Sequence, residues 1–419
     1  MRAVSAVVGA LTAVGVGFAP NAAAFDVESE QWYLKPMQVE QMWKVSTGEG
    51  VKVAVIDTGV NPNTSSLSGQ VLVDEVPKAV AYGATDDYAG HGTSMAELIA
   101  GTGANDGLQG IAPGAKIVPY RIQLRGLKGA EETRKTAVSA EAIKAAADTD
   151  AKIISMSYGG YYLDLDVKKA IKYAASKGKL LIAAVGNDGE SEGLIGYPAS
   201  APYVLGVSSM DEGSNISEFS SHGNYVDLVA PGEGIPGYCQ ASFKSYCPDL
   251  EGTSSATAIA AGAAALIWSA HPDWTANQVT RSLIDTASRD WPKDDPTQYA
   301  GYGTIRPRSV LANPDYDPGE PYSDPLGKWN KEKGEKLVTE IPPASSSSEP
   351  SAGATAGSQG ADGSSADKPA GAGSGDAKTV SSDASDDSGS TLWIALGAAA
   401  AVVVIGGGAF AVLRARRAN

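Results

Sequence analysis

Three side chains that could together hydrolyse an acyl bond occur in separate segments of the chain. Asp57 ends an apolar run, His91 lies between two glycines, and Ser254 lies in a Gly-Thr-Ser-Ser-Ala segment. A hydrolytic serine needs a neutral imidazole to accept its proton, and the imidazole needs a carboxylate that fixes its tautomer. These residue types therefore predict acyl transfer, with Ser254 as nucleophile, His91 as general base and acid, and Asp57 as the orienting carboxylate.

Each of the three residues also has an ordinary structural explanation. Asp57 could close a turn at the end of a strand, and Ser254 could be a helix N-cap. A single histidine is more often structural than catalytic, and the two others, His222 and His271, lie in a polar loop and before a proline. The order Asp, His, Ser along the chain is one that convergent triads adopt, and it favours the catalytic interpretation.

The apolar segments around these residues predict the elements that would position them. Short apolar runs have the composition of buried strands, and amphipathic stretches between them have helical spacing. This alternation predicts an α/β fold with a mostly parallel sheet, and Asp57 lies at a carboxyl strand end, where such sheets hold ligands. The expected strands are 51–56, 117–122, 153–157 and 180–185, and the expected helices are 93–100, 136–147, 167–176 and 257–269.

The segments Val-Ile-Asp57-Thr-Gly, His91-Gly-Thr and Gly-Thr-Ser254-Ser-Ala resemble the three active-site motifs of the subtilase family, in the family's order. The resemblance covers about residues 49–307. It implies a subtilisin-like three-layer fold around the central sheet and serine endopeptidase activity on a protein or peptide substrate. An esterase of the α/β-hydrolase type would instead need Gly-x-Ser-x-Gly with the histidine last, and neither feature occurs around Ser254.

Asn187 resembles the asparagine whose side-chain amide stabilises the developing oxyanion in subtilases. Asn187 follows a predicted strand in the segment Gly-Asn187-Asp-Gly. One amide donor of this kind lowers the barrier by about 3–4 kcal/mol. The resemblance implies the Ser254 backbone N–H as the second donor, whereas an isolated asparagine before Asp-Gly would be an ordinary turn residue.

The resemblance also implies which residues border a substrate cleft. Ser157, Tyr158, Gly159 and Gly186 would lie along the cleft and pair with an extended peptide by strand addition. The Tyr-Pro198-Ala segment is similar to a family segment that contains a cis proline, although a trans loop proline is the ordinary expectation.

Two glutamates depart from the family pattern. Glu97 occurs within two turns of His91 on a predicted helix. We expect it on a solvated helix face, with a perturbation of the imidazole as the alternative. Glu251 stands just before the Gly-Thr-Ser segment, where a small or amide residue is expected, and it could shape substrate preference.

The composition excludes some functions and leaves others open. The chain has 419 residues and a net charge of −15, and this acidic balance argues against a nucleic-acid-binding surface. Cys239 and Cys247 predict a disulfide that closes a short surface loop if the protein is exported, and two reduced, buried thiols are the alternative. No metal site with zinc spacing occurs in the sequence and no cofactor is required, whereas calcium ligands on loops have no recognisable spacing.

The N-terminus predicts export. Arg2, the apolar run 3–18 and the small residues that end at Ala24 predict a signal peptide over 1–24, cleaved after Ala24. An uncleaved membrane anchor is the alternative, but the run is shorter than the ~20 residues that a spanning helix needs. Residues 25–49 are too few to form a core of their own, so we expect an extension that lies against a peptidase domain over 50–312.

The C-terminal part predicts a membrane tether. Residues 313–390 are rich in Pro, Ser, Gly and Asp and predict a disordered stalk. Residues 391–413 predict one transmembrane helix, and the arginines of 414–419 predict a cytoplasmic tail. These signals predict a single-pass type I protein of the cell membrane whose catalytic domain lies outside the cytoplasm.

The whole arrangement resembles the mycosins, the membrane-anchored subtilases associated with type VII secretion. That resemblance implies a type VII secretion membrane complex as a partner. A different class of function, a catalytically idle structural subunit that uses the subtilase fold for docking, is the alternative. The presence of all three triad residue types speaks against it.

Overall fold

The computed structural model describes residues 26–162, 164–191 and 193–328, and six strands in this part form one parallel sheet. The strand order is β2-β1-β3-β4-β5-β6, and every neighbouring pair is parallel. The predicted α/β fold with a mostly parallel sheet is therefore confirmed. The strands are β1 (Lys52–Asp57), β2 (Lys116–Arg121), β3 (Ile153–Met156), β4 (Leu180–Ala184), β5 (Val204–Met210) and β6 (Leu228–Pro231).

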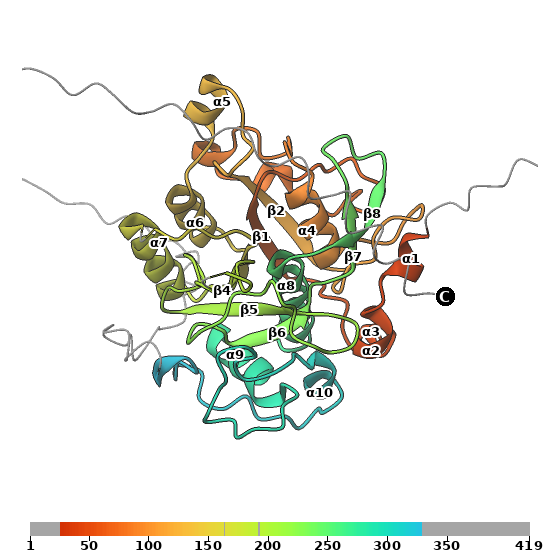
Figure 1. Cartoon of the computed structure of the whole chain (residues 1–419), viewed down its shortest axis with the longest axis vertical. Helices are drawn as coiled ribbons and strands as arrows, with labels where there is room; N and C mark the ends of the chain where they lie inside the picture. Colours follow the sequence, from red (N-terminus) through yellow and green to blue (C-terminus); the bar gives the residue numbers. More distant parts are fainter. Residues whose placement is uncertain (1–25, 163, 192, 329–419) are drawn as a thin grey trace, which may run out of the picture. The chain divides into compact units, whose positions relative to one another are not determined.

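Both faces of the sheet are buried, which explains why its strands are apolar throughout rather than alternating. Val53 and Val55 of β1 belong to one hydrophobic core, and Ala54 and Ile56 belong to another. Helices cover both faces and give three layers, as Figure 1 shows. One core holds α4 (His91–Ala100) and α8 (Thr253–Ala270), and the other holds α6 (Ser139–Ala147) and α7 (Leu165–Ser176).

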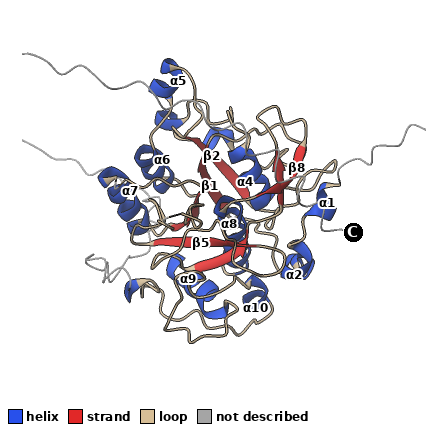
Figure 2. Ribbon diagram, viewed as in Figure 1, coloured by secondary structure: helices blue, strands red, loops and turns tan. Residues whose placement is uncertain are grey.

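Shorter elements surround these layers, and Figure 2 separates them from the loops. A two-stranded antiparallel hairpin, β7 (Ile235–Tyr238) with β8 (Tyr246–Leu250), lies outside the main sheet. The other elements are α1 (Val27–Glu30), α2 (Leu34–Met37), α3 (Val39–Trp43), α5 (Ala130–Lys135), α9 (Ala276–Thr286), α10 (Pro307–Leu311) and the 3-10 helices Val73–Glu75 and Lys78–Val80.

The N-terminal segment packs on the domain, as expected for an extension without its own core. Tyr33 and Met42 are buried in the core that contains α8. The indole N–H of Trp43 donates to the Ile111 carbonyl at 2.9 Å, and that of Trp32 donates to the Glu233 carbonyl at 3.1 Å. Segments of the chain up to about 200 residues away therefore hold this extension in place.

One predicted helix begins later in the structure than its spacing suggested. The helix predicted over 136–147 begins only at Ser139, because residues 136–137 are used by a neighbouring loop: Ile122 bridges Ala137, and the Gln123 side chain donates to the Thr136 carbonyl at 2.7 Å. Tertiary pairing overrides the helical spacing here.

The disordered stalk was predicted to begin at residue 313, and this is wrong for residues 313–328. Leu326 is buried in the core, and the Arg281 guanidinium of α9 donates to the Pro318 carbonyl at 2.7 Å. The predicted signal peptide 1–24, the stalk after residue 328, the transmembrane helix 391–413 and the tail 414–419 lie outside the described residues.

Among the described helices, only α8 has the length and apolar composition of a membrane span. Most of its surface is buried inside the protein, against β3, β4, β5 and β6. It is therefore the central core helix of the domain, and its N-terminus opens toward the carboxyl ends of the strands.

Candidate active site

Asp57 is the last residue of β1, and its side chain is fully buried. Its Oδ1 accepts hydrogen bonds from the Thr58 backbone N–H at 2.7 Å and from the Thr58 hydroxyl at 3.2 Å. Oδ1 also lies 2.7 Å from Nδ1 of His91. The other oxygen, Oδ2, is buried and has no partner among the described residues. Burial with donors on one oxygen fixes the carboxylate in a single orientation toward the imidazole.

His91 is the first residue of α4, and two glycines bring it against Asp57. Gly90 is the N-cap and has φ 82°, a left-handed conformation that favours glycine. A Cβ on Gly92 would lie 2.2 Å from the Gly59 carbonyl oxygen and 3.0 Å from the Asp57 Cβ. The flanking glycines of the sequence motif therefore allow the helix start to approach the end of β1.

The pKa of His91 is raised above the ordinary 6.5. Burial, the largest single contribution, acts to lower it. The charge of Asp57, its hydrogen bond to the ring and the charge of Asp87 favour the protonated form and outweigh burial. The ring is thus prepared to hold a proton taken from a nucleophile.

Ser254 lies in the first turn of α8, where backbone N–H groups have no partner within the helix. Its hydroxyl donates to the Ser157 carbonyl at 3.0 Å, and the Ser157 hydroxyl donates to the Ser254 carbonyl at 3.0 Å. The structure contains no hydrogen bond between the Ser254 hydroxyl and His91 within the described residues. The hydroxyl is therefore engaged by a main-chain carbonyl rather than by the imidazole.

Asn187 follows β4 and lies beside the N-terminus of α8. Its Oδ1 accepts from the Thr253 backbone N–H at 3.0 Å and from the Thr253 hydroxyl at 2.9 Å. Its Nδ2 faces the segment that carries Ser254, since a Cβ on Gly252 would lie 3.4 Å from it. The side chain is thus anchored through its oxygen, which leaves the amide N–H groups free of that anchor.

Two of the residues predicted to border a substrate cleft contact the start of α8. Ser157 follows β3 and touches Ser254, and the Gly186 N–H donates to the Thr253 hydroxyl at 3.2 Å. Tyr158 is half-buried, whereas Gly159 is exposed. The Tyr197–Pro198 peptide bond, which pairs with this segment through Gly160, is cis.

Sequence reasoning missed Asp87, which shapes the loop in front of His91. Its buried carboxylate accepts five hydrogen bonds, from the Thr58 hydroxyl, the N–H groups of Ala89 and Gly90, and the N–H and hydroxyl of Thr93. It therefore ties the end of β1 to the start of α4. The only sequence signal was an aspartate four residues before the histidine.

The predicted position of Glu97 is wrong. This residue is fully buried, because the β7–β8 hairpin covers the helix face on which it lies. The hairpin carries the disulfide between Cys239 and Cys247, which confirms the predicted pairing. Glu251 is exposed, between β8 and α8.

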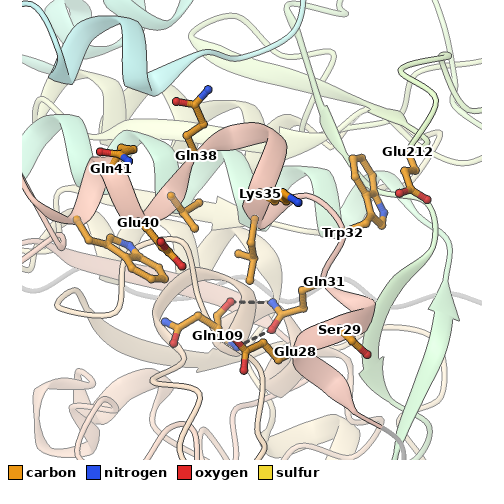
Figure 3. A pocket seen from close by; sticks show the side chains of 13 residues that line it. Glu28, Ser29, Gln31, Trp32, Lys35, Gln38, Glu40, Gln41, Gln109 and Glu212 are labelled. Carbon is orange, nitrogen blue, oxygen red and sulfur yellow. Dashed lines mark hydrogen bonds between the residues drawn. The ribbon is translucent and has the colours of Figure 1, made fainter.

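A separate cavity of about 720 Å³ lies beside the N-terminal segment (Figure 3). The Gln31 side chain connects this segment to the Gln109 backbone. Its Nε2 donates to the Gln109 carbonyl at 2.8 Å, and its Oε1 accepts from the Gln109 N–H at 2.8 Å. The lining of the cavity includes Trp32, Trp43 and Glu212 but none of the predicted catalytic residues. This cavity is therefore distinct from the site formed around Asp57 and His91.

Comparison with known proteins agrees with the geometry. The model of the subtilase family matches residues 48–304. The chain is 34% identical to thermitase from Thermoactinomyces vulgaris over 280 residues, 65% of this chain and 92% of thermitase. It is 34% identical to subtilisin Savinase from Lederbergia lenta over 248 residues, 58% of this chain and 85% of that protein.

Solved structures of mycosins are also similar. MycP1 from Mycobacterium smegmatis matches with a TM-score of 0.57 and 27% identity, covering 70% of this chain and 86% of MycP1. The MycP3 protease from the type VII (ESX-3) secretion system matches with a TM-score of 0.55 and 29% identity, covering 67% of this chain and 88% of MycP3.

Proposed function

Because the chain belongs to the subtilase family and is a serine endopeptidase, we propose that Asp57, His91 and Ser254 form its catalytic triad. The observation that carries the proposal is the 2.7 Å contact between His91 Nδ1 and the buried Asp57 carboxylate, at the strand end that the Ser254 helix faces. A buried carboxylate on Nδ1 leaves Nε2 as the nitrogen that can accept a proton.

In the proposed mechanism the Ser254 hydroxyl first leaves the Ser157 carbonyl and turns toward His91. Its oxygen attacks the scissile carbonyl carbon while the imidazole takes its proton. The imidazolium then gives that proton to the leaving amine, and an acyl ester on Ser254 results. A water molecule, deprotonated by His91, hydrolyses the ester and restores the free serine.

The oxyanion of each tetrahedral intermediate would be held by Asn187 and by the backbone N–H of Ser254. The Oδ1 anchor on Thr253 supports this role, because a pre-oriented donor needs no reorganisation when the charge develops. Ser157, Tyr158, Gly159 and Gly186 would then align the acyl part of an extended peptide beside the serine.

We further propose that the protease is anchored in the cell membrane with its catalytic domain outside the cytoplasm and works with a type VII secretion complex. The sequence signals at both ends and the similarity to MycP1 and MycP3 support this. Carbonate extraction of membranes tests the anchor. The full chain should stay in the pellet, and a chain ending at residue 390 should be released; release of both would refute the anchor.

The alternative, an idle subunit that only docks, predicts no activated serine. Fluorophosphonate labelling and casein hydrolysis by the purified full chain distinguish the two. We expect both activities in the wild type and in Ser255→Ala, which alters the neighbouring serine of the same motif, and neither in Ser254→Ala. Absence of labelling in the wild type across pH 6–9, with and without calcium, would favour the idle subunit.

A further inference from the structure

A buried carboxyl group that the proposed mechanism does not use lies on the histidine helix. Glu97 is fully buried on α4, less than two turns after His91. Its Oε1 accepts from the Thr64 hydroxyl at 2.7 Å and from the Tyr238 hydroxyl at 3.2 Å, and its Oε2 accepts from the Tyr246 hydroxyl at 2.8 Å. A buried carboxyl group is tolerated only with such partners, so these contacts define its position.

Both tyrosines belong to the β7–β8 hairpin. Their rings stack with centroids 4.4 Å apart, and their hydroxyl oxygens lie 2.8 Å apart. The Tyr238 backbone N–H also donates to the Ser94 hydroxyl at 2.9 Å, one turn before Glu97. The hairpin is therefore fastened to α4 by its backbone at Ser94 and by two hydroxyls at Glu97.

The same hairpin connects the two catalytic helices. The Gln240 carbonyl packs on Gly90, where a Cβ would lie 3.1 Å away, directly before His91. At its other end β8 continues through Glu251 and Gly252 into α8, which carries Ser254. A displacement of the hairpin would therefore move the backbone next to both the general base, His91, and the nucleophile, Ser254.

We propose that Glu97 is a positioning residue that holds the β7–β8 hairpin against α4 and so fixes His91, Ser254 and the cleft wall between them. The inference rests on the catalytic roles proposed above for His91 and Ser254. An apolar residue would leave the hydroxyls of Thr64, Tyr238 and Tyr246 without this acceptor, whereas a carboxyl or amide oxygen provides it.

The pKa of Glu97 reflects its buried position in this contact. Burial raises its pKa from 4.5 to about 7, against the opposing effect of the three hydroxyl donors. The groups that face it are the hydroxyls of Thr64, Tyr238 and Tyr246, and the two tyrosine pKa values are raised by burial and by the Glu97 charge, so they stay neutral donors. Because the folded state favours the protonated form, the fastening is retained when Glu97 takes up a proton: one oxygen then donates to a neighbouring hydroxyl and the other still accepts.

Kinetics of three variants of the full chain test the proposal. Glu97→Leu fills the site without an acceptor, Tyr246→Phe removes one donor, and Glu97→Gln keeps the shape and an acceptor oxygen but does not titrate. Tyr33→Phe, which removes a buried hydroxyl in the N-terminal segment, is the matched control for stability loss. Values of kcat, KM, the fluorophosphonate labelling rate and the melting temperature are measured for each.

We expect Glu97→Leu and Tyr246→Phe to lower kcat/KM and the labelling rate by about 10-fold or more, since small misplacements of catalytic groups have effects of this size. Glu97→Gln should stay within about 3-fold, because its amide keeps the shape and an acceptor oxygen. Tyr33→Phe should lower only the melting temperature. If Glu97→Leu does not fold, Tyr246→Phe decides the question.

The inference is wrong if Tyr246→Phe and Glu97→Leu melt like Tyr33→Phe but keep wild-type kcat and KM. This outcome differs from failure of the proposed function, in which the wild type itself would show neither labelling nor hydrolysis. A loss of kcat/KM in Glu97→Gln as large as that in Glu97→Leu would also contradict the role of the Glu97 acceptor oxygen.

Discussion

The Ser254 hydroxyl donates to the main-chain carbonyl of Ser157 at 3.0 Å, and the Ser157 hydroxyl donates back to the Ser254 carbonyl at the same distance. This reciprocal pair ties the carboxyl end of β3 to the N-terminus of α8. His91 is in turn held by its 2.7 Å contact with Asp57. In this arrangement the Ser254 hydroxyl is hydrogen-bonded to the Ser157 carbonyl and not to the imidazole.

Asp57→Asn should lower kcat by a factor of order 10⁴ with little change in KM, because an amide of the same shape favours the wrong tautomer of His91. Steady-state hydrolysis of a peptide substrate measures this. Asp86→Asn is the control, since Asp86 is a largely exposed carboxylate paired with Arg121. A loss in Asp57→Asn no larger than in Asp86→Asn would contradict the orienting role.

The activity should fall as the pH is lowered through a pKa above 6.5, because His91 must be neutral to accept a proton and Asp57 stabilises its protonated form. Imidazole NMR titration in a Ser254→Ala background observes this group directly. Adding Asp57→Asn removes the charge and should move the His91 midpoint to lower pH. An unchanged midpoint would show that Asp57 does not act on the ring.

Asn187→Asp should lower kcat by about 10²–10³-fold, as expected when one oxyanion donor is lost, with KM little affected. The aspartate retains an oxygen for the two Thr253 donors, so the melting temperature should change little. Stopped-assay kinetics with calorimetry check both. A fall in melting temperature with unchanged kcat would make Asn187 a structural residue only.

The stability of the domain should depend on Glu97 between about pH 4.5 and pH 7. The folded state holds the proton up to a pKa of about 7, whereas the unfolded chain releases it near 4.5. The folded state therefore binds more protons in this interval, and the free energy of unfolding falls as the pH rises, by on the order of 3 kcal/mol.

Urea unfolding of Ser254→Ala, which avoids self-cleavage, compared with Ser254→Ala/Glu97→Gln measures this difference. The stability of the glutamate protein relative to the glutamine protein should decrease from pH 4.5 to pH 8. Parallel pH dependences of the two proteins would show that Glu97 does not titrate in this interval.

The sequence motifs predicted the sheet, the strand ends and the residues that meet at the site, because these depend on short segments with strong local constraints. Gly90 and Gly92 illustrate this: the close approach of α4 to β1 is encoded beside His91 itself. The positions of Asp57 and Asn187 followed in the same way, from the ends of apolar strands.

Features that depend on distant segments could not be predicted. Glu97 has the spacing of a solvated helix residue, and only the hairpin tyrosines, about 140 residues later, bury it. The helix expected from residue 136 starts later because Ile122 pairs with Ala137. Leu326 lies in a polar segment that resembles a stalk, yet it completes the core.

The most direct test of the account is the site of covalent modification after the full chain reacts with a fluorophosphonate. Proteolytic fragments analysed by mass spectrometry identify the modified side chain. The proposed triad predicts one phosphonyl ester per chain, on Ser254, formed faster as His91 loses its proton. Modification of another serine, or an equal rate in Asp57→Asn, would contradict the assignment of Ser254 as the activated nucleophile.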